Sequence, residues 1–574
     1  MRLPVLFYST TISIALVIYF FLSLTRYLGA GHDDTFISLW AGRMLAEGKG
    51  FVDHNFEPLE VSSSLLHTFI IAGMYLFTPE HVFLFNKLLG LLSGAAILLL
   101  IYLNRSIFLN FSDNWNKIAF ALICLALSTS PSFLYWNLGG LETPLQTLIL
   151  FLYSIYLIKH WNTSQYLLTL AFLQSLYILV RPEGFLVLTF TLLYSLTYHY
   201  VKQKFKPVSV LILLGIPLIL FAILLGIRFA FFDMFFPNPV YAKVSLGNTS
   251  LGEILLSGIK YLIKFYSSNF YPAAISLVIC SMLIYYTWIS LTPPARLLNN
   301  ISEEFFYLSC LGLVLLNHTF ILLVGGDWMR FSRFIVPVIP LLVILSVTFS
   351  IKLIMTMDYN SHKTMFILTF FFSTLIILQI LHPNHLFRIR YSTHCLLQSG
   401  IPDFPTSPVE LKAFNQSLIL TSCAHKRDWD GILPFIKNEL PKFYHQFHQH
   451  LTIVTPQMGF FPYHVRQTWS NLNIYFIDTA GLSNKTIAHM SLPKSAIGLN
   501  GAGAILPIMM GKTQLSQYVL SKNPNLIYLL DVDDKTSKIL GKLGWIKVWS
   551  RYRANVFAKS NPSGLRRVTS HDDT

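Results

Sequence analysis

Long apolar runs separated by short polar segments make up most of the chain up to about residue 382. A helix needs roughly 17–25 predominantly apolar residues to cross the hydrocarbon core of a bilayer. Runs of this length occur near residues 4–25, 83–103, 117–135, 142–158, 165–181, 183–200, 208–230, 270–291, 304–325, 333–354 and 364–381. The pattern therefore predicts an α-helical polytopic membrane protein with about 11 transmembrane helices. A shorter run, Ser62–Phe77, is predicted to be an interfacial or partly inserted helix.

The pattern changes in the C-terminal part of the chain, which is more polar. Short β-like runs there alternate with helical or loop stretches, at Leu451–Thr455, Leu472–Asp478, Leu526–Leu530 and Ile546–Ser550. This predicts two domains: a transmembrane domain over residues 1–382 and a soluble α/β domain over residues 383–574.

The distribution of charge predicts how the chain is oriented in the membrane. The chain has 574 residues, 53% of them hydrophobic and 12% charged, with a formal net charge of +15. Its Lys and Arg residues cluster in short segments between apolar runs, which is where the positive-inside rule places them, so a nucleic-acid partner is not expected. With Arg2 inside, segments 26–61, 139–144, 181–184, 231–269 and 325–333 and the whole tail fall on the outer face. There a disulfide between Cys395 and Cys423 is permitted but not implied by the sequence.

The outer segments carry most of the candidate chemistry. Asp33 and Asp34 follow the first predicted span, and Glu60 lies in the same loop. Adjacent carboxylates are candidates for a general base and for a divalent-cation site, because one of a close pair can stay ionised while the other tunes it. A solvated loop end is the simpler interpretation of the pair alone.

Further ionisable residues lie at the mouths of later spans. They are Glu142, Arg181, Glu183, Asp327, Arg330 and Arg333. Ionisable groups this close to hydrocarbon are costly and usually face a shared cavity. Each one taken singly also fits an interfacial anchor or a helix cap.

The long loop after residue 228 adds cations and aromatic residues. Arg228 and Lys243 would suit a phosphate at headgroup depth, although snorkelling cations also occur without a ligand. His445, His448 and His450 lie close together in the tail. Without a Cys or acidic partner at a recognisable spacing they favour a polar helix or loop over a metal site.

Several short motifs in a fixed order resemble the GT-C membrane glycosyltransferases, most closely the mycobacterial-type terminal arabinofuranosyltransferases and their bacterial relatives. The motifs are Asp33-Asp34, Glu60 with Ser62-Ser63, Gly140-Leu141-Glu142-Thr143-Pro144, Arg181-Pro182-Glu183-Gly184, Pro237-Asn238 with Tyr241-Ala242-Lys243, Gly325-Gly326-Asp327-Trp328 with Arg333, and Ile477-Asp478-Thr479-Ala480-Gly481-Leu482-Ser483. The likeness extends over nearly the whole chain.

The resemblance implies a catalytic transmembrane domain in a bacterial cytoplasmic (inner) membrane. It implies inverting transfer of a sugar, arabinofuranose or another pentose or hexose, from a polyprenyl-phosphate donor to an envelope glycan or glycolipid. Asp33 is the implied general base, with Asp34 and Glu60 shaping the site or, for the Asp33-Asp34 pair, holding Mg or Mn. The implied donor and phosphate ligands are Arg181, Asn238, Tyr241, Lys243, Arg330 and Arg333, and Glu142, Glu183 and Asp327 complete the site. A lipid-linked sugar transporter, a protein O-glycosyltransferase and an inactive scaffold remain as alternatives.

Overall fold

The computed structural model describes residues 2–27, 31–162, 166–202, 207–244, 250–268, 294–327, 329, 331–356, 431–490, 508–509, 514–530, 532–551 and 554–560. The chain forms two compact units. Unit 1 comprises Met1–Leu28, Lys87–Ile223 and Leu251–Gln398, and unit 2 comprises Gly29–Asn86, Leu224–Ser250 and Ser399–Thr574. Two segments from the N-terminal part of the chain therefore belong to the same unit as the C-terminal sheet.

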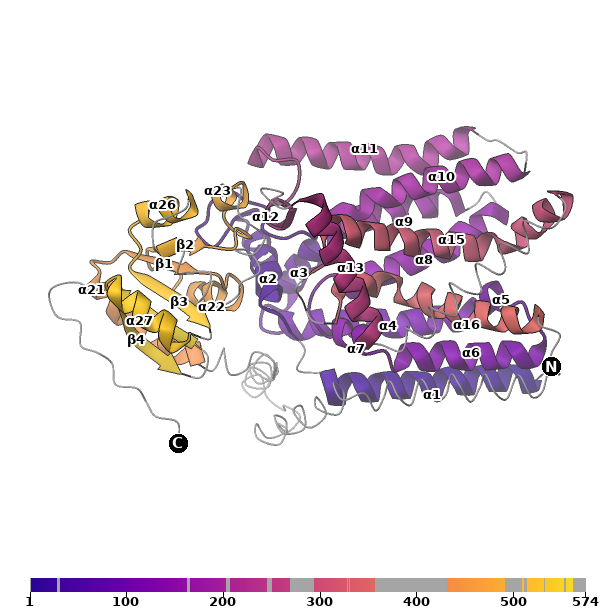
Figure 1. Ribbon diagram of the computed structural model, residues 1–574, viewed down its shortest axis with the longest axis horizontal. Helices are drawn as coiled ribbons and strands as arrows, with labels where there is room; N and C mark the ends of the chain where they lie inside the picture. The colour runs from indigo at the N-terminus through magenta and orange to yellow at the C-terminus, as the bar shows by residue number, and fades with distance from the viewer. Residues whose placement is uncertain are drawn as a thin grey trace. The chain divides into compact units, whose positions relative to one another are not determined.

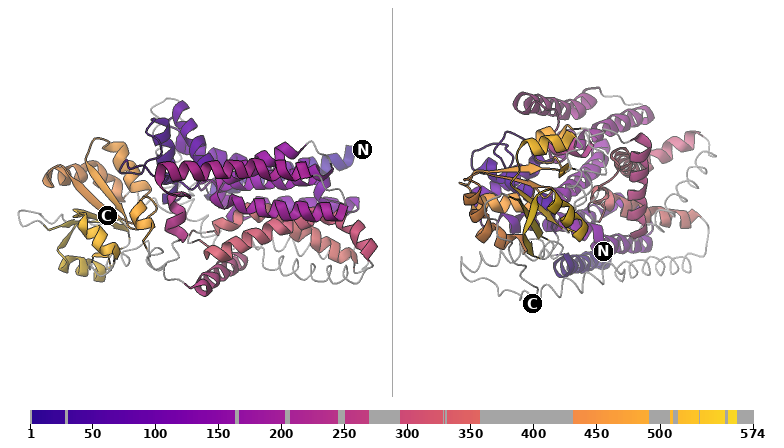
Figure 2. Two further views of the ribbon diagram at one scale, coloured as in Figure 1. Left: turned by 90° about the horizontal axis from the view of Figure 1, so that it is seen from above. Right: turned by 60° about the vertical axis from the view of Figure 1, so that its left-hand side comes forward.

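Unit 1 is built from helices (Figures 1 and 2). They are α1 (Arg2–Tyr27), α4 (Val82–Leu103), α5 (Arg105–Phe108), α6 (Asp113–Ser128), α7 (Pro131–Asn137), α8 (Thr143–Asn162), α9 (Leu167–Val180), η2 (Pro182–Gly184), α10 (Phe185–Lys202), α11 (Pro207–Phe232), α13 (Leu251–Ser268), α15 (Pro294–Val324), η3 (Arg333–Val338) and α16 (Ile339–Thr356). Each predicted span that falls on described residues coincides with one or more of these helices. The spans predicted near 270–291 and 364–381 lie outside the described residues.

Length and composition identify the membrane-spanning helices. Among the described residues, five helices are long and apolar enough to cross a bilayer, or six if one bent pair counts as a single span. They are Val5–Thr25, Val82–Leu103, Val208–Phe232, Tyr307–Val324 and Arg333–Lys352. Shorter apolar helices are Leu65–Phe77, Thr143–Lys159, Leu167–Val180 and Pro182–Leu196. The chain is therefore a multi-pass membrane protein.

One predicted span is not straight. The run near 117–135 forms two helices, α6 and α7, which meet at an angle of 55°. Pro131 occupies the first turn of α7. Proline has no N–H to continue the hydrogen-bond ladder of the preceding helix, so the run breaks there.

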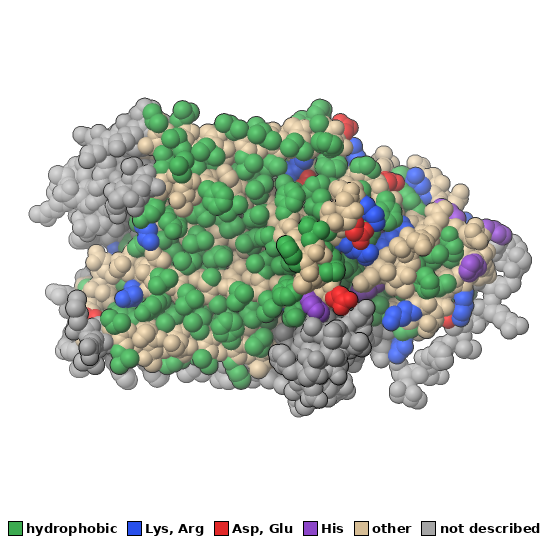
Figure 3. Space-filling view, turned by 180° about the vertical axis from the view of Figure 1, so that it is seen from behind, with side chains coloured by type: hydrophobic (Ala, Val, Ile, Leu, Met, Phe, Trp, Pro, Cys, Tyr) green, Lys and Arg blue, Asp and Glu red, His purple; other side chains and the backbone are tan. Residues whose placement is uncertain are grey.

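Side-chain exposure in unit 1 fits contact with lipid. Only 11% of the spanning part of α11, Val208–Phe232, is buried, whereas 94% of Arg333–Lys352, which covers η3 and most of α16, is buried. Val208, Leu211 and Ile219 are among the apolar residues that α11 exposes. Figure 3 shows hydrophobic side chains spread over the helical surface, with few charged ones among them.

Unit 2 contains a five-stranded sheet in the order β2-β1-β3-β5-β4. Its strands are β1 (Leu451–Thr455), β2 (Ile474–Asp478), β3 (Leu526–Leu530), β4 (Trp545–Arg551) and β5 (Ala554–Lys559). β2, β1 and β3 are parallel, and β5 and β4 continue the sheet as an antiparallel pair. The predicted α/β fold of the tail is confirmed, although β5 was not predicted.

Successive side chains of a strand point to opposite faces of the sheet, so alternating residues pack into two separate cores. Ile453 and Phe476 belong to one core with α22 (Phe460–Thr468), α21 (Leu440–Gln446) and η4 (Phe435–Glu439). Val454 and Ile477 belong to the other core. That second core also takes in residues of α23 (Lys485–Ala488), α26 (Gln514–Ser521) and α27 (Asp534–Lys542). Both faces of the sheet are thus covered.

The segment before residue 86 adds two helices to the first of these cores. α2 (Asp33–Ala46) contributes Phe36 and Trp40 to it, and α3 (Leu65–Phe77) packs against α2. Contact between the two helices is close at Gly42, where an added Cβ would lie 2.3 Å from the side chain of Ile71. Ser64 caps α3 by accepting from the backbone N–H of His67.

Candidate active site

Asp33 is the first residue of α2 and is half-buried. Its two carboxylate oxygens each accept one backbone hydrogen bond, at 2.8 Å, from the N–H groups of Gly459 and Phe460. Those groups belong to the start of α22. Helix N-termini favour negative charge because their first N–H groups have no partner within the helix. The sequence-predicted base is therefore held between the start of its own helix and the start of α22.

Asp34 is the next residue of α2 and is also half-buried. It lies in the first turn of the helix, a position that favours an acid. The two acids of the predicted pair thus occupy consecutive positions at a helix start.

Glu60 is 3% exposed and forms a bidentate ion pair with Arg228. The Nε and Nη2 atoms of Arg228 donate to its two carboxylate oxygens at 2.6 and 2.9 Å. Both oxygens of Glu60 are thus engaged by one guanidinium. This geometry fits a residue that positions the loop better than one that binds a cation.

Asn238, at the start of α12 (Asn238–Val244), links this pair to the C-terminal motif, residues 477–483. Its backbone N–H donates to the carbonyl of Glu60, and its side-chain amide donates to the carbonyls of Gly481 and Leu482. In the same helix Tyr241 stacks on His489 at 4.5 Å. Asn238 and Tyr241 therefore brace the loop in this arrangement. The side chain of Lys243 lies outside the described residues.

The C-terminal motif is itself a compact turn after β2. Asp478 is fully buried and accepts hydrogen bonds from the N–H groups of Ala480 and Ser483 and from the Ser483 hydroxyl. Burial raises the pKa of Asp478 to about 6, while those hydrogen bonds act in the opposite direction. Residues 477–483, one of the motifs that carry the resemblance, thus form the end of β2 and the turn after it.

We expect Arg228→Lys to destabilise the protein by about 1.5–3 kcal/mol, because a lysine cannot make the two parallel bonds that Glu60 receives. The measurement is thermal unfolding of detergent-solubilised protein. Arg43→Lys is the matched control, since the Arg43–Glu47 pair is partly exposed, with 23% and 32% of the side chains accessible. Equal melting temperatures for the two variants would show that the buried pair stabilises the protein no more than the partly exposed pair does.

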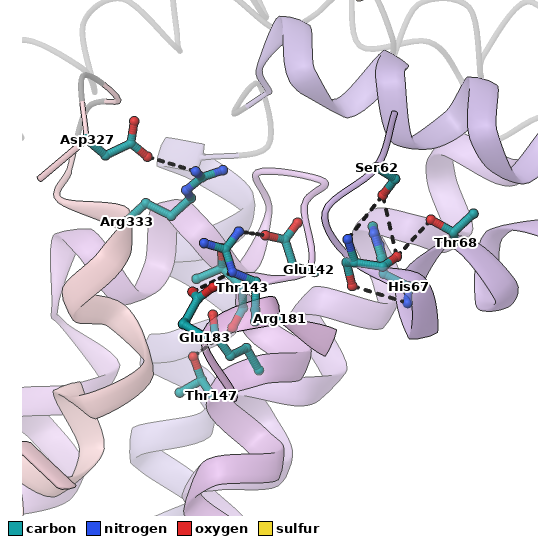
Figure 4. Close-up of polar contacts among 12 residues, drawn as sticks. Ser62, His67, Thr68, Glu142, Thr143, Thr147, Arg181, Glu183, Asp327 and Arg333 are labelled. Atoms are coloured by element: carbon teal, nitrogen blue, oxygen red, sulfur yellow. Dashed lines mark hydrogen bonds and ion pairs between the residues drawn. The ribbon is translucent and has the colours of Figure 1, made fainter. Parts of the chain in front are cut away.

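Unit 1 holds a second set of ionisable side chains (Figure 4). Arg181 bridges two acids: its Nη1 donates to Glu142 and its Nε to Glu183, both at 2.7 Å. The side chain of Arg181 is 8% exposed and that of Glu142 is 4% exposed. Two carboxylates on one guanidinium leave this group with net negative charge.

Asp327 and Arg333 form a further buried pair, with 2.8 Å between carboxylate oxygen and guanidinium nitrogen. The guanidinium of Arg333 lies 5.2 Å from the ring centre of Phe334, and that of Arg181 lies 5.5 Å from it. Phe334 thus touches both ion-paired arginines. The structure brings the predicted residues of unit 1 together, except Arg330, which lies outside the described residues.

Lys87 was missed by the sequence analysis. It lies within α4 and is only 3% exposed. Gly90, three residues later, lies on the same face of the helix. An added Cβ on Gly90 would lie 2.2 Å from the carbonyl of Asn137, so this face packs closely against neighbouring backbone. A buried lysine within a spanning helix is a functional candidate by its cost alone. The sequence shows this feature as a lysine within the apolar run at residues 83–103.

Asp33 and Glu60 both have partners within the protein. Asp33 directs one oxygen to each of two N–H groups, and Glu60 gives both oxygens to Arg228. Over the parts of the chain that the structure describes, no group of three or more His, Cys, Asp or Glu side chains is placed to hold a metal. Cys395 and Cys423 lie outside those parts.

No protein-family model and no curated protein matches the chain. Among solved structures, it is similar to ArnT from Cupriavidus metallidurans bound to undecaprenyl phosphate, with 14% identity, a TM-score of 0.49, and coverage of 97% of this chain and 99% of that one. It is also similar to the Archaeoglobus fulgidus oligosaccharyltransferase in complex with Zn and sulfate, with 11% identity, a TM-score of 0.46, and coverage of 94% and 69%. Sequence identities of 14% and 11% do not establish a function for this chain, so a proposal must rest on its own residues.

Proposed function

We propose that this protein is a membrane glycosyltransferase that transfers a sugar, with inversion, from a polyprenyl-phosphate donor to an envelope glycan or glycolipid on the outer face of the bacterial cytoplasmic membrane. The observation that carries the proposal is the carboxylate of Asp33, at the start of α2, which is held by two backbone N–H groups from the start of α22. A carboxylate fixed in this way can accept a proton from an acceptor hydroxyl.

The reaction follows from the chemistry of the donor. Asp33 takes the proton of the acceptor hydroxyl as its oxygen attacks the anomeric carbon of the sugar. The bond between that carbon and the phosphate oxygen breaks, and the polyprenyl phosphate leaves with the electron pair. Because a phosphate leaves as a stabilised anion, no strong general acid is required, and a cation near the phosphate stabilises the developing charge.

Several cations are candidates for the phosphate. Arg181 and Arg333 are already paired with carboxylates, so a phosphate would share them with Glu142, Glu183 and Asp327. Lys87 joins them as a buried cation of the same unit. Lys243 and Arg330 remain proposed ligands from the sequence. No step here requires a divalent cation.

The test uses membranes that contain the protein, a panel of radiolabelled polyprenyl-phosphate sugars, and crude envelope acceptor. Label that moves from lipid to acceptor supports the proposal and identifies the sugar. Mass spectrometry of envelope glycans from cells with and without the gene then identifies the acceptor. If the protein transfers no sugar but moves labelled lipid across the bilayer, it is a transporter.

The proposal requires residues 431–560 to be outside the cytoplasm. We expect a reporter that is active only in the cytoplasm to stay silent when it is fused after Thr574, because an odd number of crossings from an inside N-terminus ends outside. The same reporter fused within residues 203–206, between α10 and α11, is the positive control. A strong C-terminal signal would contradict the predicted orientation.

A further inference from the structure

We infer that the α/β sheet region of unit 2 is part of the catalytic apparatus, because Gly459 and the start of α22 position the carboxylate of Asp33. This inference rests on the proposed function and names the groups that place its general base. Gly459 and Phe460 are positioning residues here, since they act on the reaction through Asp33.

The close approach depends on glycine. A Cβ added to Gly459 would lie 1.8 Å from the backbone carbonyl oxygen of Asp33 and 2.7 Å from its carboxyl carbon. Real Cβ contacts of this kind essentially never fall below 3.0 Å. Any larger residue must therefore push the backbone of Asp33 away by more than about 1 Å, a displacement that costs on the order of 10²-fold in rate when it moves a catalytic group.

The topology of the sheet explains why N–H groups are available at this point. β1 lies between β2 and β3, so the chain leaves β1 toward one side for β2 and later reaches β3 on the other side. In open α/β sheets, ligands bind beyond the carboxyl ends of the strands where this reversal occurs. The loop after β1 leads directly into α22, so the first N–H groups of this helix follow the carboxyl end of β1. In this protein they bind the chain's own Asp33.

The packing around the contact is equally specific. Phe460 and Phe36 meet edge to face at 5.1 Å, and Phe36 also lies against Tyr463. Phe36 is one turn beyond Asp33 in α2, so the first turns of α2 and α22 are joined both by hydrogen bonds and by aromatic contacts. A displacement of α22 therefore displaces Asp33.

The test compares Gly459→Ala with Gly541→Ala in full-length protein assayed for sugar transfer. Gly541 lies in α27, and a Cβ there would meet nothing within 4 Å. We expect Gly459→Ala to lower kcat about 10²-fold while KM for the lipid donor changes less than about threefold, and Gly541→Ala to match the wild type. A purely structural role would lower the amount of folded protein without changing kcat per folded molecule.

Hydrogen exchange gives a second readout that needs neither activity nor a Gly459 variant. We expect Asp33→Asn to speed exchange in the peptide that covers residues 456–468. The start of α27, where Asp533 caps Thr536, serves as the unaffected control segment. Unchanged exchange at 456–468, or a wild-type kcat for Gly459→Ala, overturns the inference. If exchange responds as expected but the wild type transfers sugar from no donor, the proposed function is wrong and the contact serves structure alone.

Discussion

Asp33→Asn is expected to lower the rate of sugar transfer by about 10²–10⁴-fold, the usual loss when a general base is removed. An amide of nearly the same shape cannot take up the proton of the acceptor hydroxyl. Transfer is measured in membranes with saturating donor, so that the change appears in kcat. Asp113→Asn is the matched control, because Asp113 is also the first residue of a helix but pairs with Lys117 at the surface.

The structure adds a second consequence to this substitution. If Asp33 lay at a solvated loop end, its replacement would leave folding unaffected. Asp33 instead receives two N–H bonds from α22, and an asparagine side chain has one oxygen to receive them. Asp33→Asn therefore also loosens α22. A wild-type rate in this variant would exclude Asp33 as the base, whatever happens to α22.

The variant Asp34→Asn distinguishes the role of Asp34 from that of Asp33. Asp34 shares the first turn of α2 with Asp33. If Asp33 is the base, Asp34→Asn should retain a measurable rate, with a smaller loss than Asp33→Asn. The reverse order of the two losses would move the role of base to Asp34.

The helices of unit 1 could be predicted because membrane spans are read from local composition over a single window of sequence. The bend at Pro131 depends on a single residue, and the strand β5 depends on its neighbours in the sheet. β5 is a short run whose pairing with β3 and β4 is non-local, and strand formation depends on such neighbours. The membership of residues 29–86 in unit 2 depends on contacts between residues 388 to 427 positions apart in the sequence, which no local pattern can predict.

The candidate site divides in the same way. Residue types and order pointed to Asp33, Glu142, Arg181 and Asp327 as ionisable groups of the outer face. The pairing of Glu60 with Arg228, across 168 positions of sequence, could not be read from either motif. Neither could the use of Gly459, because a glycine required by a close approach looks like any loop glycine until its neighbour is known.

Arg181→Met is expected to destabilise the protein by about 3–5 kcal/mol, the usual cost when one partner of a buried ion pair is removed. The variant leaves the carboxylates of Glu142 and Glu183 without the guanidinium that bridges them. Thermal unfolding in detergent measures the loss. Arg43→Met is the control, because its pair with Glu47 is partly exposed and contributes about 1 kcal/mol or less.

A triple variant separates the structural role of Arg181 from a role in binding phosphate. Arg181→Met combined with Glu142→Gln and Glu183→Gln removes the uncompensated charges, so most of the stability should return, since replacing a whole buried ion-pair group by neutral residues is often close to neutral. If Arg181 also binds the donor phosphate, transfer by the stable triple variant stays far below the wild type, because a methionine supplies no positive charge at the leaving group. Recovery of transfer together with stability would assign Arg181 to structure alone and leave the phosphate to the other cations.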